Sequence, residues 1–304
     1  ELPGFAGGNM SRLVVDLRDD MDCSFVMAQG PSHITSVSGL SLDVGTTFSA
    51  PWLASLVTVA GPLVLRRVRN VDLSGLVTVG TLGIDVQSAS YDGALELPKF
   101  VGRAGAPVYI AVGSLCTSVK LGHGSGGVAM ADMSRLYVVQ TAASGTMTID
   151  IGGAAGGPEA VNGDMELGCV GGCVIGSSIG GLSRLQRVGP ASGLWKYRLE
   201  GIGAAALMAK DMATVELTAG VSLTIRGTSV ATSFVAGRSS GGVVGGTLLV
   251  EDNVALTKMC GIAGVTWGTV TLRNNAMLPA MCESEHGMTC SMCSGNNGGG
   301  SCGC

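Results

Sequence analysis

Short segments in which apolar and polar residues alternate recur along the whole of this chain. Each covers four or five residues and is often entered through a glycine. Alternation with a period of two is typical of a half-buried β-strand. We therefore expect an all-β protein with strands at residues 12–16, 39–43, 61–65, 80–84, 107–110, 127–130, 145–149, 163–167, 193–197, 221–225, 246–250 and 268–272.

The last two segments belong to a repeat. Gly246, Leu248, Val250, Asn253 and Leu256 return at a constant shift as Gly268, Val270, Leu272, Asn275 and Leu278. A second repeat is Leu56–Val59, which returns as Leu76–Val79. Like residues that return at this spacing indicate stacked coils, whereas a sandwich of hairpins spaces its strands by about 8–12 residues. We expect a right-handed parallel β-solenoid, or β-helix, with about 20–22 residues per coil.

The composition agrees with thin coils. The chain has 304 residues, of which 46% are hydrophobic, only 4% are aromatic and 50 are glycine. The net charge of −4 argues against a nucleic-acid partner. The densest basic stretch, Arg66 to Arg69, fits a solvated edge better than a binding patch. Since no run of 18 apolar residues occurs, no transmembrane segment is predicted in this portion.

The outward side chains of the strands are expected to be small, mixed and mostly uncharged. No set of carboxylates falls at matching coil positions, which argues against a polysaccharide-active enzyme, and a weakly charged surface favours self-association. The predicted outward row is Ser41, Val64, Gly83, Tyr109, Ala129, Thr148, Glu166, Lys196, Thr224, Leu249 and Thr271.

Three local patterns mimic chemical sites. Residues 201–206 follow a strand with a Gly-x-Gly pattern, but that strand is too charged to be the central strand of a dinucleotide fold. Residues 237–241 match the sequence pattern of a nucleophile elbow, but no apolar strand directly precedes them. Asp16, Asp19, Asp20 and Asp22 lack the glycine and alternate spacing of a calcium loop. We therefore predict no catalytic residue, cofactor or metal.

The stretch from Gly246 to Met281 resembles the receptor L-domain family, whose members stack leucine-rich-like coils into a right-handed β-solenoid. The resemblance implies that Asn253 and Asn275 close the coil turns as scaffold residues. Residues 61–76 fit more loosely, with Asn70 near the place of the asparagine, and residues 100–220 lack it. A pectate-lyase-like β-helix stays open for that middle part.

Ten cysteines, half of them at or after position 282, favour an oxidising compartment. The spacing of this last group resembles the first five cysteines of an EGF-like module that the sequence cuts short. Disulfides are favoured there over a zinc site built from the last four. A local bridge is favoured for Cys169 and Cys173, while the pairing of the others stays open. The tail cysteines are Cys282, Cys290, Cys293, Cys302 and Cys304.

We thus expect a solenoid domain over residues 1–281, with an irregular loop at about 152–189, and an EGF-like segment over residues 282–304. Asn9, in Asn-Met-Ser, is a possible N-glycosylation site. The predicted function is that of an extracellular or cell-surface structural or adhesive protein, not an enzyme, which associates with itself or with other extracellular proteins. The alternatives are a receptor-like ectodomain that binds a peptide or glycan and a polysaccharide-active β-helix enzyme.

Overall fold

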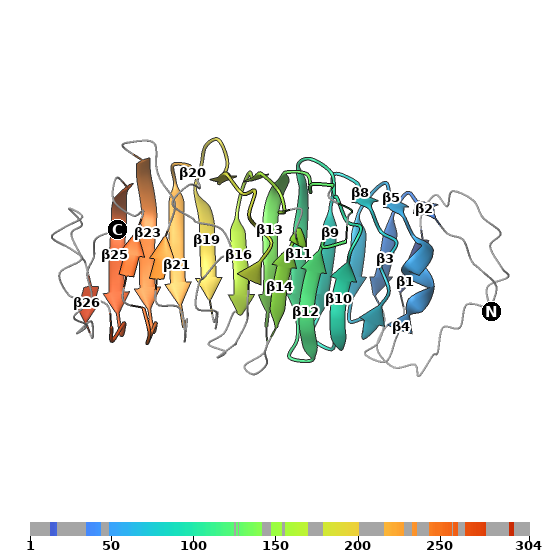
Figure 1. Ribbon diagram of the computed structural model, residues 1–304, viewed down its shortest axis with the longest axis horizontal. Coiled ribbons are helices and arrows are strands. Elements are labelled where there is room, and N and C mark those ends of the chain that lie inside the picture. The colour runs from blue at the N-terminus through green and yellow to red at the C-terminus, as the bar shows by residue number, and fades with distance from the viewer. Residues whose placement is uncertain are drawn as a thin grey trace.

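The computed structural model describes residues 13–16, 35–43, 49–124, 126, 128–141, 147–153, 156–169, 179–200, 216–227, 233–235, 243–256, 258–260, 265–277 and 292–294. In this part of the chain, parallel strands stack into an elongated β-solenoid. Strands β1 (Leu13–Asp16) and β26 (Met292–Ser294) lie near opposite ends of the rod (Figure 1). The only helix described over its full length is the 3-10 helix η1 (Pro51–Ser55). The predicted all-β solenoid is confirmed.

A long sheet runs the length of the rod (Figure 1) and has 15 strands. Strands β15 (Ala160–Val161), β18 (Arg187–Val188) and β20 (Glu216–Leu217) branch from it. The main path, with parallel pairing throughout, is β1, β3 (Leu40–Asp43), β6 (Leu63–Arg66), β9 (Ile84–Ser88), β11 (Ala106–Val112), β13 (Met133–Gln140), β16 (Met165–Cys169), β19 (Trp195–Glu200), β21 (Val221–Arg226), β23 (Val243–Glu251), β25 (Val265–Arg273) and β26.

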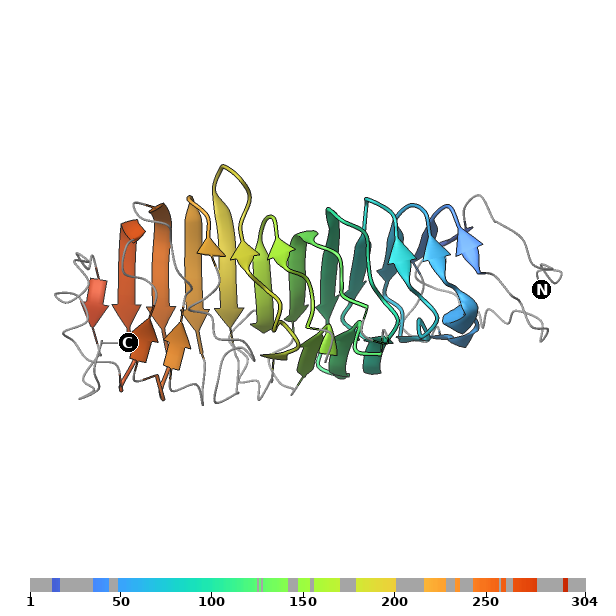
Figure 2. The same ribbon diagram turned by 45° about the horizontal axis from the view of Figure 1, so that its top comes forward.

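Shorter parallel sheets form the other sides of the coils (Figure 2). One set follows the long-sheet strands along the chain: β4 (Ser49–Ala50) with β7 (Asn70–Val71); β10 (Gly93–Leu97), β12 (Cys116–Leu121), β14 (Thr148–Ile151) and β17 (Ile179–Gly180); β22 (Ser233–Val235) with β24 (Lys258–Cys260). The other set precedes them: β2 (Ser36–Val37), β5 (Thr58–Val59) and β8 (Thr78–Val79). Thr58 pairs with Thr78, so the repeat of Leu56–Val59 as Leu76–Val79 is one step between coils.

The core consists of columns of inward side chains that run along the rod. Each member contacts its equivalents in the coils before and after it, and burial of this apolar surface is the main stabilising term. Aliphatic residues suffice for such a column, which explains the low aromatic content. One column, with no member more than 2% exposed, is Leu40, Leu63, Ile84, Val108, Leu136, Met165, Tyr197, Leu223, Leu248 and Val270.

The coils are less uniform than predicted. Asn253 and its equivalent Asn275 in the next coil are separated by |i−j| = 22, but Asp164 and its equivalent Lys196 are separated by |i−j| = 32. Parallel pairing sets which residues are opposed in the sheet, while the turns outside the sheet can lengthen. Residues 152–189, predicted as an irregular loop, in fact contain β15, β16, β17 and β18.

Three predicted strands lie elsewhere than expected. Residues 128–130 form no strand, and the chain enters the long sheet only at Met133. Of residues 80–84, only Ile84 belongs to a strand. Thr148 belongs to β14 in the second sheet, not to the long one. A period of two fits several neighbouring segments equally well, so the pattern alone left the choice of strand open.

A left-handed corner follows several strands of the long sheet. Arg67, Asp252 and Asn274 have φ of 56°, 59° and 55°, and Gly227 has φ of 62°. The N–H groups of Arg67, Gly227 and Asp252 donate to a carbonyl in the last two residues of the strand in the next coil, over 3.1, 3.1 and 3.2 Å. After Arg67, Asp252 and Asn274, this corner turns the following residue inward.

The corner places Asn253 and Asn275 inside the coil, and it places Val68, not Asn70, at the same position near the start of the chain. Asn70 lies two residues further on, exposed at the beginning of β7. The match of Asn70 to the repeated asparagine was therefore wrong.

Strand β26 lies inside the segment predicted to be a separate cysteine-rich module. It pairs in parallel with β25, with Leu272 opposite Cys293 and Arg273 opposite Ser294. The long sheet therefore crosses the expected boundary between residues 281 and 282.

Candidate functional site

The outward side chains of the long sheet form rows across neighbouring strands. The middle row is Ser41, Val64, Asp85, Tyr109, Tyr137, Glu166, Arg198, Thr224, Leu249 and Thr271. Sequence analysis placed Gly83, Ala129 and Lys196 where Asp85, Tyr137 and Arg198 lie. Each error shifts the register by an even number of residues, so the in–out alternation gave no warning. The expected uncharged face was wrong in the middle of the sheet.

Two tyrosines stack on this face. Tyr109 of β11 and Tyr137 of β13 are opposed, with ring centroids 4.2 Å apart and ring planes within 3° of parallel. The guanidinium carbon of Arg135 lies 5.6 and 5.5 Å from the two ring centroids, within the range of a cation–π contact. Both rings are half-buried. Burial raises the pKa of Tyr137 to about 12.

Carboxylates and arginines follow on the next strands. Arg135 Nη2 lies 3.5 Å from both Asp164 and Glu166. Arg198 Nη1 lies 3.8 Å from the other oxygen of Glu166, and Arg198 Nε donates to Glu200 Oε2 over 2.8 Å. The side chains of Glu166 and Glu200 are only 6% and 2% exposed. Burying a carboxylate costs free energy unless it is paired and hydrogen-bonded in this way.

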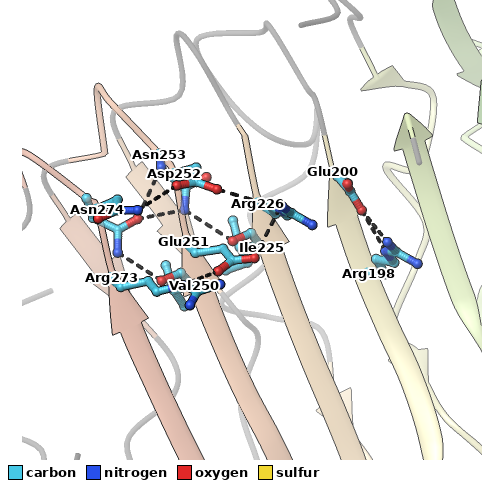
Figure 3. A network of polar contacts seen from close by, with 11 residues as sticks. Arg198, Glu200, Ile225, Arg226, Val250, Glu251, Asp252, Asn253, Arg273 and Asn274 are labelled. Carbon is cyan, nitrogen blue, oxygen red and sulfur yellow. Dashed lines mark hydrogen bonds and ion pairs between the residues drawn. The ribbon is translucent and has the colours of Figure 1, made fainter. Parts of the chain in front are cut away.

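A second run of charges continues toward β25 (Figure 3). Glu200, Arg226, Glu251 and Arg273 are opposed in register on β19, β21, β23 and β25. Glu251 is 3% exposed, and its two oxygens lie 3.1 Å from Arg226 Nε and 2.5 Å from Arg273 Nε. Arg226 also lies 3.7 Å from Asp252. Opposite charges therefore alternate along the rod, one per coil.

These contacts overturn the expectation that no carboxylates cluster at matching coil positions. They do cluster, but arginines of neighbouring strands contact them, and both oxygens of Glu251 are engaged. We call this set, Arg135, Asp164, Glu166, Arg198, Glu200, Arg226, Glu251 and Arg273, the charge ladder. One of its buried oxygens, Glu200 Oε1, has no hydrogen-bond partner among the residues that the structure describes.

A ladder of amides lies inside the turn next to it. Asn253 and Asn275 are fully buried. Asn253 Nδ2 donates to the Ile225 carbonyl over 3.1 Å and to Asn275 Oδ1 over 2.8 Å, and the Asn253 N–H donates to the same oxygen over 3.2 Å. Asn275 Nδ2 donates to the Val250 carbonyl over 2.9 Å. The two amides thus connect three successive coils.

Sequence analysis missed two buried polar side chains at strand ends in the middle of the chain. Ser88 and Gln140 share one inward column through Val112, one position before that of the two asparagines in the register of the sheet. Ser88 Oγ donates to the Val68 carbonyl over 2.5 Å, and Gln140 Nε2 donates to the Gly113 carbonyl over 2.9 Å. Their position at the end of an alternating strand was the available signal, but a search for asparagine alone could not detect it.

The basic stretch near the start of the rod is paired. Arg67 Nε lies 2.8 Å from Asp43, Arg69 lies 3.0 Å from Asp92, and Arg66 lies 3.6 Å from Asp85. Each aspartate belongs to a neighbouring coil. The stretch is therefore not an unpaired anion-binding patch.

An open hollow of about 450 Å³ lies beside β7 and β10. Its lining includes Asn70, Asp72, Ser74 and Glu96. Lys120 Nζ donates to Glu96 over 2.8 Å, and this hydrogen bond lowers the pKa of the Glu96 carboxyl.

The cysteines fall into four groups. Cys169 is disulfide-bonded. Cys116 is a free thiol buried in the core, and burial raises its pKa to about 11. Cys260 and Cys293 lie on β24 and β26, where the backbone alone is described. The remaining predicted sites, Cys173, Cys282, Cys290, Cys302, Cys304 and Asn9, lie outside the described residues.

The patterns at residues 201–206 and 237–241 also lie outside the described residues, as do Asp19, Asp20 and Asp22. Within the part of the chain that the structure describes, no three His, Cys, Asp or Glu residues gather as metal ligands. No helix there is long and apolar enough to cross a membrane. Comparison with known proteins finds no matching family model, no matching curated protein and no matching solved structure.

Proposed function

We propose that this chain is an extracellular structural or adhesive protein that assembles with itself or with other surface proteins, as in a cell-surface filament, a ciliary hair or a matrix. The observation that carries the proposal is that polar groups bond from coil to coil along the rod. The charge ladder links neighbouring coils by ion pairs on the outer face, and the amides of Asn253 and Asn275 link them by hydrogen bonds in the turns. In a solenoid, where each coil contacts only its neighbours, such links favour a stiff rod that can act as a spacer.

Two further observations support this proposal. Cys169 is disulfide-bonded, and disulfides persist mainly in oxidising compartments such as the cell exterior. Aliphatic side chains also project into solvent at the turns: Leu194 is 85% exposed, Leu82 67% and Val254 57%. On a chain with only 13% charged residues, such side chains favour association.

The resemblances found in the sequence belong to this proposal. The buried amides of Asn253 and Asn275 support coils of the receptor L-domain type, since the asparagines lie in the turns. The cysteine spacing supports an EGF-like module after the solenoid. However, the pairing of β26 with β25 favours one more solenoid coil over Met292–Ser294.

Assembly can be tested by sedimentation velocity and electron microscopy under non-reducing conditions, over a series of protein concentrations. We expect particles larger than a monomer that grow with concentration. Leu194→Asp should shift the distribution toward monomer, because it places a charge at an exposed apolar side chain. Ser192→Asp, also exposed, adds the same charge and should leave assembly unchanged. A monodisperse monomer at every concentration refutes self-assembly.

The hollow beside β7 and β10 favours a second candidate, a receptor-like ectodomain that binds a glycan. Asn70, Asp72 and Ser74 offer amide, carboxylate and hydroxyl groups at one open site, and such groups bind sugar hydroxyls. Binding to an oligosaccharide array that Asp72→Ala abolishes supports this candidate. Asp92→Ala, outside the lining, is the control and should bind normally.

A further inference from the structure

The stacked pair Tyr109 and Tyr137 is unlike the other tyrosines of the chain, which has four in all. Tyr91 and Tyr197 are fully buried, whereas the stacked pair lies half-buried on the outer face of the long sheet. The phenols that a soluble oxidant can reach are therefore already in contact with each other.

Their geometry suits one type of reaction. When a phenol loses one electron and one proton, the unpaired electron spreads to the ring carbons beside the oxygen, in orbitals perpendicular to the ring. In Tyr109 and Tyr137 the ring planes are 3° from parallel and the centroids 4.2 Å apart, so these orbitals point at each other. Since adjacent strands hold both rings, the encounter is intramolecular and needs no diffusion of two chains.

We propose that Tyr109 and Tyr137 form a dityrosine cross-link, a modification site that joins β11 to β13. The oxidant is a peroxidase with hydrogen peroxide. Each phenol gives up one electron and one proton, and a carbon–carbon bond forms between a Cε atom of each ring. The hydrogen on each bonded carbon then leaves as a proton while a phenolic oxygen gains one. Overall the protein loses two hydrogen atoms, and one hydrogen peroxide becomes two waters.

The neighbouring charge favours coupled loss of electron and proton. Arg135 lies over both rings, so a ring that lost only an electron would place positive charge beside a guanidinium. Burial also raises the pKa of Tyr137, which keeps the ring a neutral phenol at neutral pH. After coupling, the surface position of the rings lets them turn about the new bond.

The cross-link would connect neighbouring coils covalently. Tyr109 and Tyr137 belong to successive coils and are opposed in the sheet, so the bond closes one coil of the rod. Both rings belong to one chain, and the inference therefore holds whether or not the chain assembles.

The test is to treat the folded, dilute protein with peroxidase and hydrogen peroxide at neutral pH. We expect dityrosine fluorescence in the monomer band and the loss of two hydrogen atoms from the intact mass. After reduction of disulfides, trypsin should release the peptide 104–120 joined to the peptide 136–184, as the lysine and arginine positions require. Tyr109→Phe and Tyr137→Phe should each reduce the yield to that of a reaction without oxidant.

Tyr91→Phe is the matched control and should keep the wild-type yield, because Tyr91 is buried away from the pair. Three results overturn the inference: dityrosine that persists in Tyr109→Phe, dityrosine found only in dimers or larger species, or none in the wild type when free tyrosine in the same reaction couples. Circular dichroism of each variant verifies that the solenoid is folded before oxidation.

Discussion

The most discriminating test of the fold is to remove one amide of the Asn253–Asn275 ladder. In Asn275→Ala, the N–H and Nδ2 groups of Asn253 lose their contact with Asn275 Oδ1, and the Val250 carbonyl loses its donor. Asn253 Nδ2 keeps its bond to the Ile225 carbonyl. The substitution therefore removes a side-chain partner from two buried backbone groups.

Leaving a buried polar group unsatisfied costs about 1–3 kcal/mol, so the substitution should lower the free energy of unfolding by about 2–6 kcal/mol. That is a large part of the roughly 5–15 kcal/mol that stabilises an ordinary domain. The loss should be greatest near β23 and β25, because each coil contacts only its neighbours. Urea unfolding measures the total, and hydrogen exchange of residues 243–277 measures the local effect.

Asn70→Ala is the control. Asn70 is exposed and was the residue that the sequence pattern placed in the same role, yet its loss should change stability by no more than about 0.5 kcal/mol. The double variant Asn253→Ala/Asn275→Ala should cost less than the sum of the single changes, since each removes the partner of the other. An effect of Asn275→Ala no larger than that of Asn70→Ala refutes the structural role of the ladder.

Two further outcomes are expected. Glu251→Gln should destabilise the chain by about 2 kcal/mol, which is less than the roughly 3–5 kcal/mol for a fully buried ion pair because both arginine partners can turn to solvent. Exposed Asp252→Asn should change stability by less than about 1 kcal/mol; equal effects in urea unfolding contradict the charge ladder. Burial raises the pKa of Tyr137 to about 12, above the value of about 10 expected in the unfolded chain. As the pH rises, Tyr137 therefore loses its proton in the unfolded chain before it does so in the folded chain. The free energy of unfolding is retained below about pH 10 and falls as the pH rises toward 12. Ultraviolet titration and unfolding at several pH values check this, and a constant stability across that range contradicts it.

Part of the polar architecture could be predicted from sequence. The asparagines at positions 253 and 275 follow two nearly identical strands at a constant shift, so their common position was visible. Ser88 and Gln140 share an inward column with each other but differ in chemistry, and the coils between them differ in length, so no repeat marks them. The charge ladder was hidden for the same reason. The alignment of Arg198 and Tyr137 with residues of the neighbouring strands can be recognised only when the first residue of each strand is known.

The sequence alone determined that this chain is a parallel β-solenoid. Segments that alternate with a period of two, and like residues that return from one coil to the next, fit stacked columns of aliphatic side chains and few other arrangements. The tertiary structure decided which alternating segment enters the long sheet in the middle of the chain. A period of two is satisfied by every even shift of register, so only the hydrogen bonding of one coil onto the next selects Met133–Gln140 over residues 127–130. That selection brings Tyr137 onto Tyr109 and Arg198 between its carboxylates.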